Sequence, residues 1–181
     1  MDFVEKARVF ATGAHCAAGN VRKYTGEPYV SHPIAVAGIV TTVPHTRAML
    51  AASLLHDTVE DTHVTIEDIW REFGAEVATL VGWLSDVSRR EDGNRATRKA
   101  KDREHLQAAP PAAKTIKLAD VIENTQSIVA HDRRFAMTYL PEMVALVEVL
   151  KDGDPILWER ANALVQDGCR ALGLVVRHSG E

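Results

Sequence analysis

The chain has 181 residues, a length typical of one domain, and its 46% hydrophobic content is enough to form a core. A formal net charge of -4 argues against a general nucleic-acid binder, which usually presents a dominant basic surface. No apolar run approaches the ~20 residues of a membrane span, and the stretch from Met1 to Lys6 does not resemble a signal peptide, so we expect a cytoplasmic protein with no membrane partner.

In the first half of the chain, apolar residues recur mostly at intervals of three and four, the spacing of helices. A turn between Gly19 and Gly26 separates the first two predicted helices, and Pro33 opens the second, where its missing N–H costs nothing. Thr65 is the predicted N-cap of a short helix with an acidic first turn. The predicted helices lie at 3–14, from Pro33 onward, at 49–55, from Thr65 to about Gly74, and at 75–84.

The second half begins with a polar stretch, Ser88 to Asn94, which we interpret as a surface loop. Helical spacing then predicts helices at 96–107, 112–127, 134–150 and 155–172, with breaks at Pro110-Pro111 and at 152–155. No segment favours a sheet. The sequence therefore predicts an all-α protein with one domain over 1–181, whose C-terminal helix lies at about 155–174.

Two cysteines, Cys16 and Cys169, lie far apart and form no CxxC pair. They could form a disulfide, but scattered thiols in a chain without a secretion signal are more often reduced and structural. We therefore expect both to be reduced.

The segment 54–62 contains four titratable residues directly after a strongly apolar stretch: His56, Asp57, Glu60 and Asp61. Buried charge is costly, so such a cluster needs partners or a metal ion. An adjacent His and Asp at a helix end can turn toward one ion, and mixed imidazole and carboxylate ligands suit Mn, Fe, Co or Zn. The alternative is a helix end that carries solvated acids.

Two distant segments add similar residues. The segment 26–33 places His32 at the start of a helix, immediately before its proline, where it could also serve only as a cap. The segment 117–125 places Asp120 inside an apolar helix, with Asn124 one turn further along the same face. An aspartate in such surroundings needs compensation, from a metal ion or from a neighbouring helix.

Taken together, His32, His56-Asp57 and Asp120 resemble the H…HD…D signature of the HD-domain phosphohydrolases. The segments Arg22-Lys23, GEPYVSHP, LLHDTVEDT and KLADVIENT are similar to those of the hydrolase domain of RelA/SpoT-type enzymes, and the chain length matches the stand-alone small alarmone hydrolases. The similarity covers about residues 3–150. It implies an HD-type helical bundle.

The resemblance also implies one metal ion, usually Mn2+ although other divalent transition metals can serve, held by His32, His56, Asp57 and Asp120. The implied substrate is a small nucleotide such as ppGpp, from which the 3′-pyrophosphate is removed to leave the nucleoside 5′-diphosphate or triphosphate. Glu60 and Asp61 match the catalytic acids of the family. The residues that match nucleotide contacts are Arg22, Lys23, Asn124 and, with a weaker alignment, Tyr139.

These residue types suit phosphate-ester hydrolysis. A divalent ion polarises the phosphoryl oxygen and lowers the pKa of water, and Glu60, one turn beyond His56, can orient or deprotonate that water. Asp61 would assist it or help to protonate the departing oxygen.

The segment 89–103 contains seven Arg or Lys and three acids. We interpret it as a basic flap for the 5′ phosphates, in which Arg98, Lys99 and Lys101 are the preferred contacts. The alternative is a solvated helix face with i,i+4 charge pairs.

The sequence departs from the common family pattern at Ile122-Glu123, where many relatives carry a basic or aromatic residue, and at 125–127. The base of the alarmone, guanine or adenine, is therefore left open. Two further hypotheses are hydrolysis of another phosphate ester, such as a nucleoside monophosphate or the 2′-phosphate of NADPH, and a non-catalytic nucleotide-binding module. The sequence gives no oligomeric state.

Overall fold

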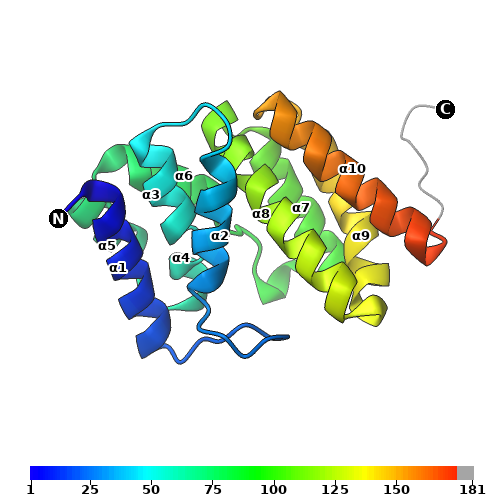
Figure 1. Ribbon diagram of the computed structural model, residues 1–181, viewed down its shortest axis with the longest axis horizontal. Helices are drawn as coiled ribbons and strands as arrows, with labels where there is room; N and C mark the ends of the chain where they lie inside the picture. Colours follow the sequence, from blue (N-terminus) through cyan, green and yellow to red (C-terminus); the bar gives the residue numbers. More distant parts are fainter. Residues whose placement is uncertain (175–181) are drawn as a thin grey trace.

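The computed structural model describes residues 1–174 of the chain, and these form helices joined by short loops (Figure 1). The described residues contain no strand and only one isolated bridge, between Val21 and Pro28, so the all-α prediction is confirmed. The helices are α1 (Phe3–Ala17), α2 (Ser31–Val40), α3 (Arg47–Leu55), α4 (Thr58–Asp61), α5 (Ile66–Phe73), α6 (Ala75–Leu84), the 3-10 turn η1 (Arg90–Asp92), α7 (Arg95–Gln107), α8 (Pro111–His131), α9 (Arg133–Val149) and α10 (Pro155–Leu172).

Polar caps define several of these helices. The Thr65 side chain accepts from Asp68 N while the Asp68 carboxylate accepts from Thr65 N, so both residues of a capping box begin α5 as predicted. Asp154 accepts from two amide groups at the start of α10, directly before the Pro155 that occupies the first helical position. Gly173 ends α10 with a φ of 70°, in the left-handed region that favours glycine.

Helix α8 lies at the centre of the molecule, between α2 on one side and α10 on the other (Figure 1). Helix α3 packs on α1, α2 and α6, and α7 packs on α9. Within the described residues, none of the helices combines the length and the apolar character needed to cross a membrane. The arrangement brings α2, α3 and α8 into mutual contact, and these are the helices that carry the histidines and Asp120.

The structure differs from the sequence prediction at several helix boundaries. Helix α2 begins at Ser31, two residues before Pro33, because the amide groups of a whole first turn have no partner and a proline anywhere in that turn is tolerated. Helix α8 continues to His131, and the short α4 and η1 were not predicted. The predicted domain's last residues, 175–181, lie outside the described part. Cys16 is exposed, Cys169 is buried, and both are free.

Candidate metal centre and adjoining cavity

Four sequence-predicted ligands converge where α2, α3 and α8 meet. His32 lies in the first turn of α2, His56 is the C-cap of α3, Asp57 is the N-cap of α4, and Asp120 lies in the middle of α8. Ligand atoms of His32, His56 and Asp57 all lie within 4.8 Å of one another. The Oδ1 atom of Asp120 is 3.3 Å from Nε2 of His32 and 3.8 Å from Nε2 of His56. The four residues of the motif, although far apart in the sequence, therefore lie close together in the structure.

Both imidazole rings present Nε2 to this cluster because their Nδ1 atoms are engaged elsewhere. His56 Nδ1 lies 2.8 Å from the carbonyl oxygen of Ser53, and His32 Nδ1 lies 2.6 Å from Oε2 of Glu123. The Nε2 atom of His56 is buried without a hydrogen-bond partner, although Asp57 Oδ1 lies 3.0 Å away. A lone pair on a buried Nε2, aimed at carboxylate oxygens, fits a bound cation.

The electrostatics of the cluster also favour a cation. Burial alone would raise the pKa of Asp57, but the neighbouring His56 and His32 lower it well below its usual range. Burial alone would lower the pKa of His32 and His56, yet the surrounding carboxylates raise these to about 11 and about 10. The cluster thus favours positive charge between its carboxylates, and two imidazoles with two carboxylates suit a divalent transition-metal ion.

Glu60 and Asp61 lie on α4 and follow His56 and Asp57 along the chain. Glu60 is exposed as a whole residue, but the protein atoms around its carboxylate exclude enough water to raise its pKa to about 7. The negative charge of the nearby Asp86 also raises this pKa, whereas the positive charge of Lys117 lowers it. Its Oε1 accepts a hydrogen bond of 2.8 Å from the backbone N–H of Asp86. Burial, together with the charge of Asp57, raises the pKa of Asp61 as well.

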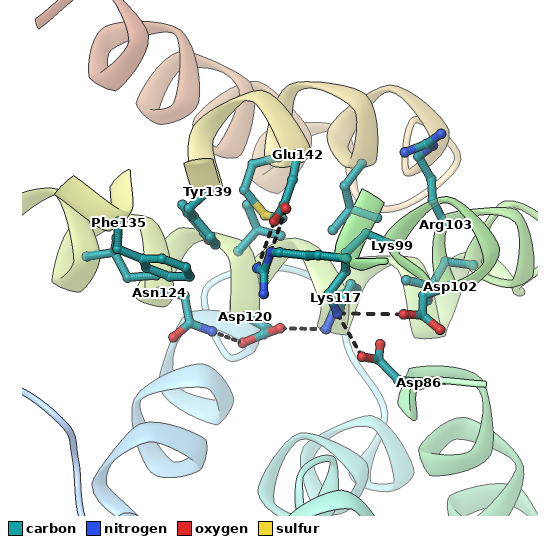
Figure 2. A pocket seen from close by; sticks show the side chains of 16 residues that line it. Asp86, Lys99, Asp102, Arg103, Lys117, Asp120, Asn124, Phe135, Tyr139 and Glu142 are labelled. Atoms are coloured by element: carbon teal, nitrogen blue, oxygen red, sulfur yellow. Dashed lines mark hydrogen bonds and ion pairs between the residues drawn. The ribbon is translucent and has the colours of Figure 1, made fainter. Parts of the chain in front are cut away.

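A cavity of about 270 Å³ adjoins this cluster of His and Asp side chains and shares Asp120 with it. Figure 2 shows Asp120 between two polar partners at this boundary: Asn124 Nδ2 donates to Oδ1 over 2.6 Å, and Lys117 Nζ lies 2.8 Å from Oδ2. The cavity is formed mainly by α7, α8 and α9. Its other lining residues are Asp86, Arg95, Lys99, Asp102, Arg103, Leu106, Val121, Ile128, Phe135, Tyr139, Glu142, Met143 and Leu146.

Three cations of α7 line this cavity: Arg95, Lys99 and Arg103. Arg95 makes two hydrogen bonds to Glu142, of 2.7 and 2.9 Å. Lys99 Nζ lies 2.7 Å from Oδ2 of Asp86 (Figure 2). Of the three predicted phosphate contacts, only Lys99 lines the cavity.

Arg98 and Lys101 are not among the lining residues, and Lys101 is paired with Asp92 over 2.8 Å. Residues 95, 99 and 103 recur every four positions and share a helix face, whereas 101 lies on the far side of the helix and 98 at the flank of that face. The spacing groups these residues by face, but it does not show which face meets the cavity.

The remaining predicted substrate residues lie around the same region. Arg22 is half-buried against Glu123 of α8, and the exposed Lys23 pairs with Asp132 at the junction of α8 and α9. Tyr139 is buried, lines the cavity, and its hydroxyl lies 3.2 Å from that of Thr125. Asn124 and Tyr139 therefore reach the cavity directly.

Sequence reasoning assigned no role to three residues that contact the cluster. Lys117 pairs with Asp120, Tyr29 Oη donates to Asp57 Oδ2 over 2.7 Å, and Glu123 contacts His32. Lys117 had a signal, because it precedes Asp120 by three positions on one helix and must share its face. The contacts of Tyr29 and Glu123 join segments that are distant in the sequence, and such contacts cannot be predicted from helical periodicity.

Comparison with known protein families and structures adds to this geometry. The model of a family described as "HD domain" matches residues 7–142. A probable guanosine-3′,5′-bis(diphosphate) 3′-pyrophosphohydrolase of Synechocystis is 47% identical over 68 residues, which are 38% of this chain and 9% of that protein. A GTP pyrophosphokinase of Brucella suis is 34% identical over 139 residues, which are 72% of this chain and 18% of that protein. The chain thus spans less than a fifth of the length of either relative.

A solved structure is similar over nearly its whole length. It is described as a metazoan ortholog of SpoT that hydrolyses ppGpp, and it superimposes with a TM-score of 0.80 at 26% identity. The match covers 97% of this chain and 98% of that one. The similarity therefore extends over more of this chain than the match to either relative.

Proposed function

Because the chain belongs to the HD domain family, in its RelA/SpoT branch, we propose that it hydrolyses the 3′-pyrophosphate of an alarmone nucleotide. The products are pyrophosphate and the nucleoside 5′-diphosphate or 5′-triphosphate. Either ppGpp or ppApp, or their 5′-triphosphate forms, can be the substrate. The observation that carries this proposal is the convergence of His32, His56, Asp57 and Asp120 at one end of a cavity lined by cations.

An HD domain with this His and Asp cluster implies a divalent metal ion. We propose that the ion is Mn2+ and that His32, His56, Asp57 and Asp120 hold it. When bound, such an ion supplies Lewis acidity toward a phosphoryl oxygen and lowers the pKa of water. The two engaged Nδ1 atoms support this assignment, because they leave both Nε2 atoms free toward the carboxylates.

Glu60 and Asp61 are the proposed catalytic acids. With a pKa raised to about 7, Glu60 exists in both protonation states near neutral pH, as suits a group that accepts a proton from the attacking water. Asp61 assists it or helps to protonate the departing ribose 3′ oxygen. The backbone N–H of Asp86 fixes the Glu60 carboxylate in place.

The cations around the cavity are the proposed partners of the substrate's phosphates. Lys99 is the contact from α7 that the cavity supports, and Arg95 and Arg103 share its face. Arg22, Lys23, Asn124 and Tyr139 are the proposed nucleotide contacts of the loop before α2 and of helices α8 and α9. Arg98 and Lys101 remain sequence predictions without a place in the cavity lining.

Incubation of the purified, Mn2+-loaded protein with ppGpp, ppApp and NADPH in separate reactions tests the proposal. We expect pyrophosphate from at least one of the two alarmones and no orthophosphate from NADPH, and the ratio of the alarmone rates gives the base preference. The Glu60→Gln protein is the matched control for contaminating hydrolases. Release of orthophosphate from NADPH without pyrophosphate from either alarmone would overturn the proposal in favour of another phosphate ester.

A further inference from the structure

Glu123 contacts two residues of proposed function, one with each carboxylate oxygen. Its Oε2 lies 2.6 Å from Nδ1 of His32, and its Oε1 accepts a hydrogen bond of 2.7 Å from Nη2 of Arg22. The exposed fractions of the three side chains are low, 17% for Glu123, 14% for Arg22 and 1% for His32. The carboxylate is therefore shared between a proposed metal ligand and a proposed nucleotide contact.

The two histidines of the cluster differ in what holds them. His56 is held through a neutral backbone carbonyl of its own helix, whereas His32 is held through a charged side chain of another helix. A carboxylate that accepts from Nδ1–H fixes the tautomer with a lone pair on Nε2 and makes that nitrogen a stronger ligand. Only the orientation of His32 depends on a side chain 91 positions away in the sequence.

A simple ion pair with Arg22 does not account for this arrangement. Asp132 offers a comparison, because its carboxylate pairs with Lys23, the next residue of the same loop, without any contact to a residue of the metal cluster. In Glu123, by contrast, the oxygen that faces His32 is distinct from the one that faces Arg22. One carboxylate thereby ties the loop before α2 and the first turn of α2 to α8.

We propose that Glu123 is a positioning residue of the metal centre: it fixes the tautomer and orientation of His32, and the same carboxylate holds Arg22 beside the cluster. This rests on the metal ligands assigned under the proposed function. Glu123 lies at the position where the sequence departs from the common family pattern.

The Glu123→Gln variant tests this role. A glutamine has one acceptor oxygen in place of two, so it can serve His32 or Arg22 but turns a donor NH2 toward the other. We expect a dissociation constant for Mn2+ that is about 10- to 100-fold higher by titration calorimetry. We also expect a changed visible absorption spectrum in the Co2+-substituted protein, because the orientation of an imidazole ligand affects that spectrum.

Asp132→Asn is the matched control, since it removes the charge of the neighbouring ion pair and keeps an oxygen for the cap of α9. Its Mn2+ affinity and Co2+ spectrum should equal those of the wild type. Helix content in EDTA shows whether each variant folds. Should Glu123→Gln fail to fold, Glu123→Asp keeps the charge but cannot reach both partners, and the same weakening is expected there.

Unchanged Mn2+ affinity and an unchanged Co2+ spectrum in the folded Glu123 variant would overturn the inference. Neither measurement involves a nucleotide, so the positioning role of Glu123 and the proposed function can be contradicted independently of each other. A wild type that binds Mn2+ but releases no pyrophosphate contradicts only the proposed function. A wild type that releases pyrophosphate, with a Glu123 variant that binds Mn2+ as tightly, contradicts only the positioning role.

Discussion

At the residue scale, Asp120 and Glu60 are carboxylates of one site whose surroundings favour different charge states. Burial alone would raise the pKa of Asp120, but Lys117 and both histidines hold it well below its usual range. For Glu60, the effect of burial outweighs the opposing charge of Lys117, and its pKa rises to about 7. A pair of carboxylates with separated pKa values can divide ligation and proton transfer between them.

Substitution of each carboxylate should therefore have a different effect. We expect Asp120→Ala to lose its metal on gel filtration, because it removes a ligand. Glu60→Gln should keep the metal but lose about 10²-fold or more in kcat, the usual contribution of a general acid or base. Elemental analysis and steady-state kinetics measure these effects. A fully metallated and active Asp120→Ala protein would show that the ligand assignment is wrong.

The raised pKa of Glu60 also predicts how activity depends on pH. A base accepts a proton only when ionised, so kcat/KM should rise with pH up to the pKa of Glu60 and then level off. In the metal-free protein that pKa is about 7, and a bound cation lowers it, so the rise in kcat/KM should be centred at or below pH 7. The Glu60→Gln variant should not show this rise. If the rise persisted in that variant, another group would be responsible for it.

At the element scale, the position of α8 depends on close contacts with its neighbours. Gly153, in the turn between α9 and α10, lies so near α8 that an added Cβ would be 2.8 Å from Leu118 Cδ1 and 3.1 Å from the carbonyl carbon of Lys114. Both contacts are on the helix that carries Lys117 and Asp120. The backbone of this turn therefore packs directly against the first half of α8.

Replacement of Gly153 by alanine should lower the free energy of unfolding by about 1–3 kcal/mol, as expected for an overpacked contact. Urea unfolding measures the change. Gly38→Ala is the control, since Gly38 is exposed in α2 with no atom near an added Cβ, and it should be neutral or up to ~1 kcal/mol more stable. If Gly153→Ala unfolded at the same urea concentration as the wild type, the close contact would not constrain α8, because the helix could move to accommodate the added methyl group.

Sequence patterns predicted the longer helices, because apolar spacing and caps are local signals. The four residues of α4 are fewer than the window in which a helical period is visible, so this helix was missed. The start of α2 was placed late because the preference of proline for the first position is not a requirement. Which cations of α7 face the cavity depends on how α7 packs on α9, which its own residues do not determine.

At the scale of the whole molecule, the site is assembled from segments nearly ninety residues apart. The motif identified His32, His56, Asp57 and Asp120 together, and the structure brings them to one point. The contact of Glu123 with His32 was not predicted, because a single sequence carries no signal for pairs of side chains on different helices. Apolar periodicity therefore predicts the helices, and the H…HD…D motif predicts the cluster of His32, His56, Asp57 and Asp120. The contacts that support this cluster are seen only in the folded structure.

Anomalous diffraction at the manganese absorption edge, from crystals of the Mn2+-loaded protein, tests the metal assignment most directly. We expect one anomalous peak at full occupancy within coordination distance of His32, His56, Asp57 and Asp120, with Glu60 and Asp61 outside the ligand set. A peak held by a different set of residues, or no peak at this cluster under saturating Mn2+, would contradict the assignment.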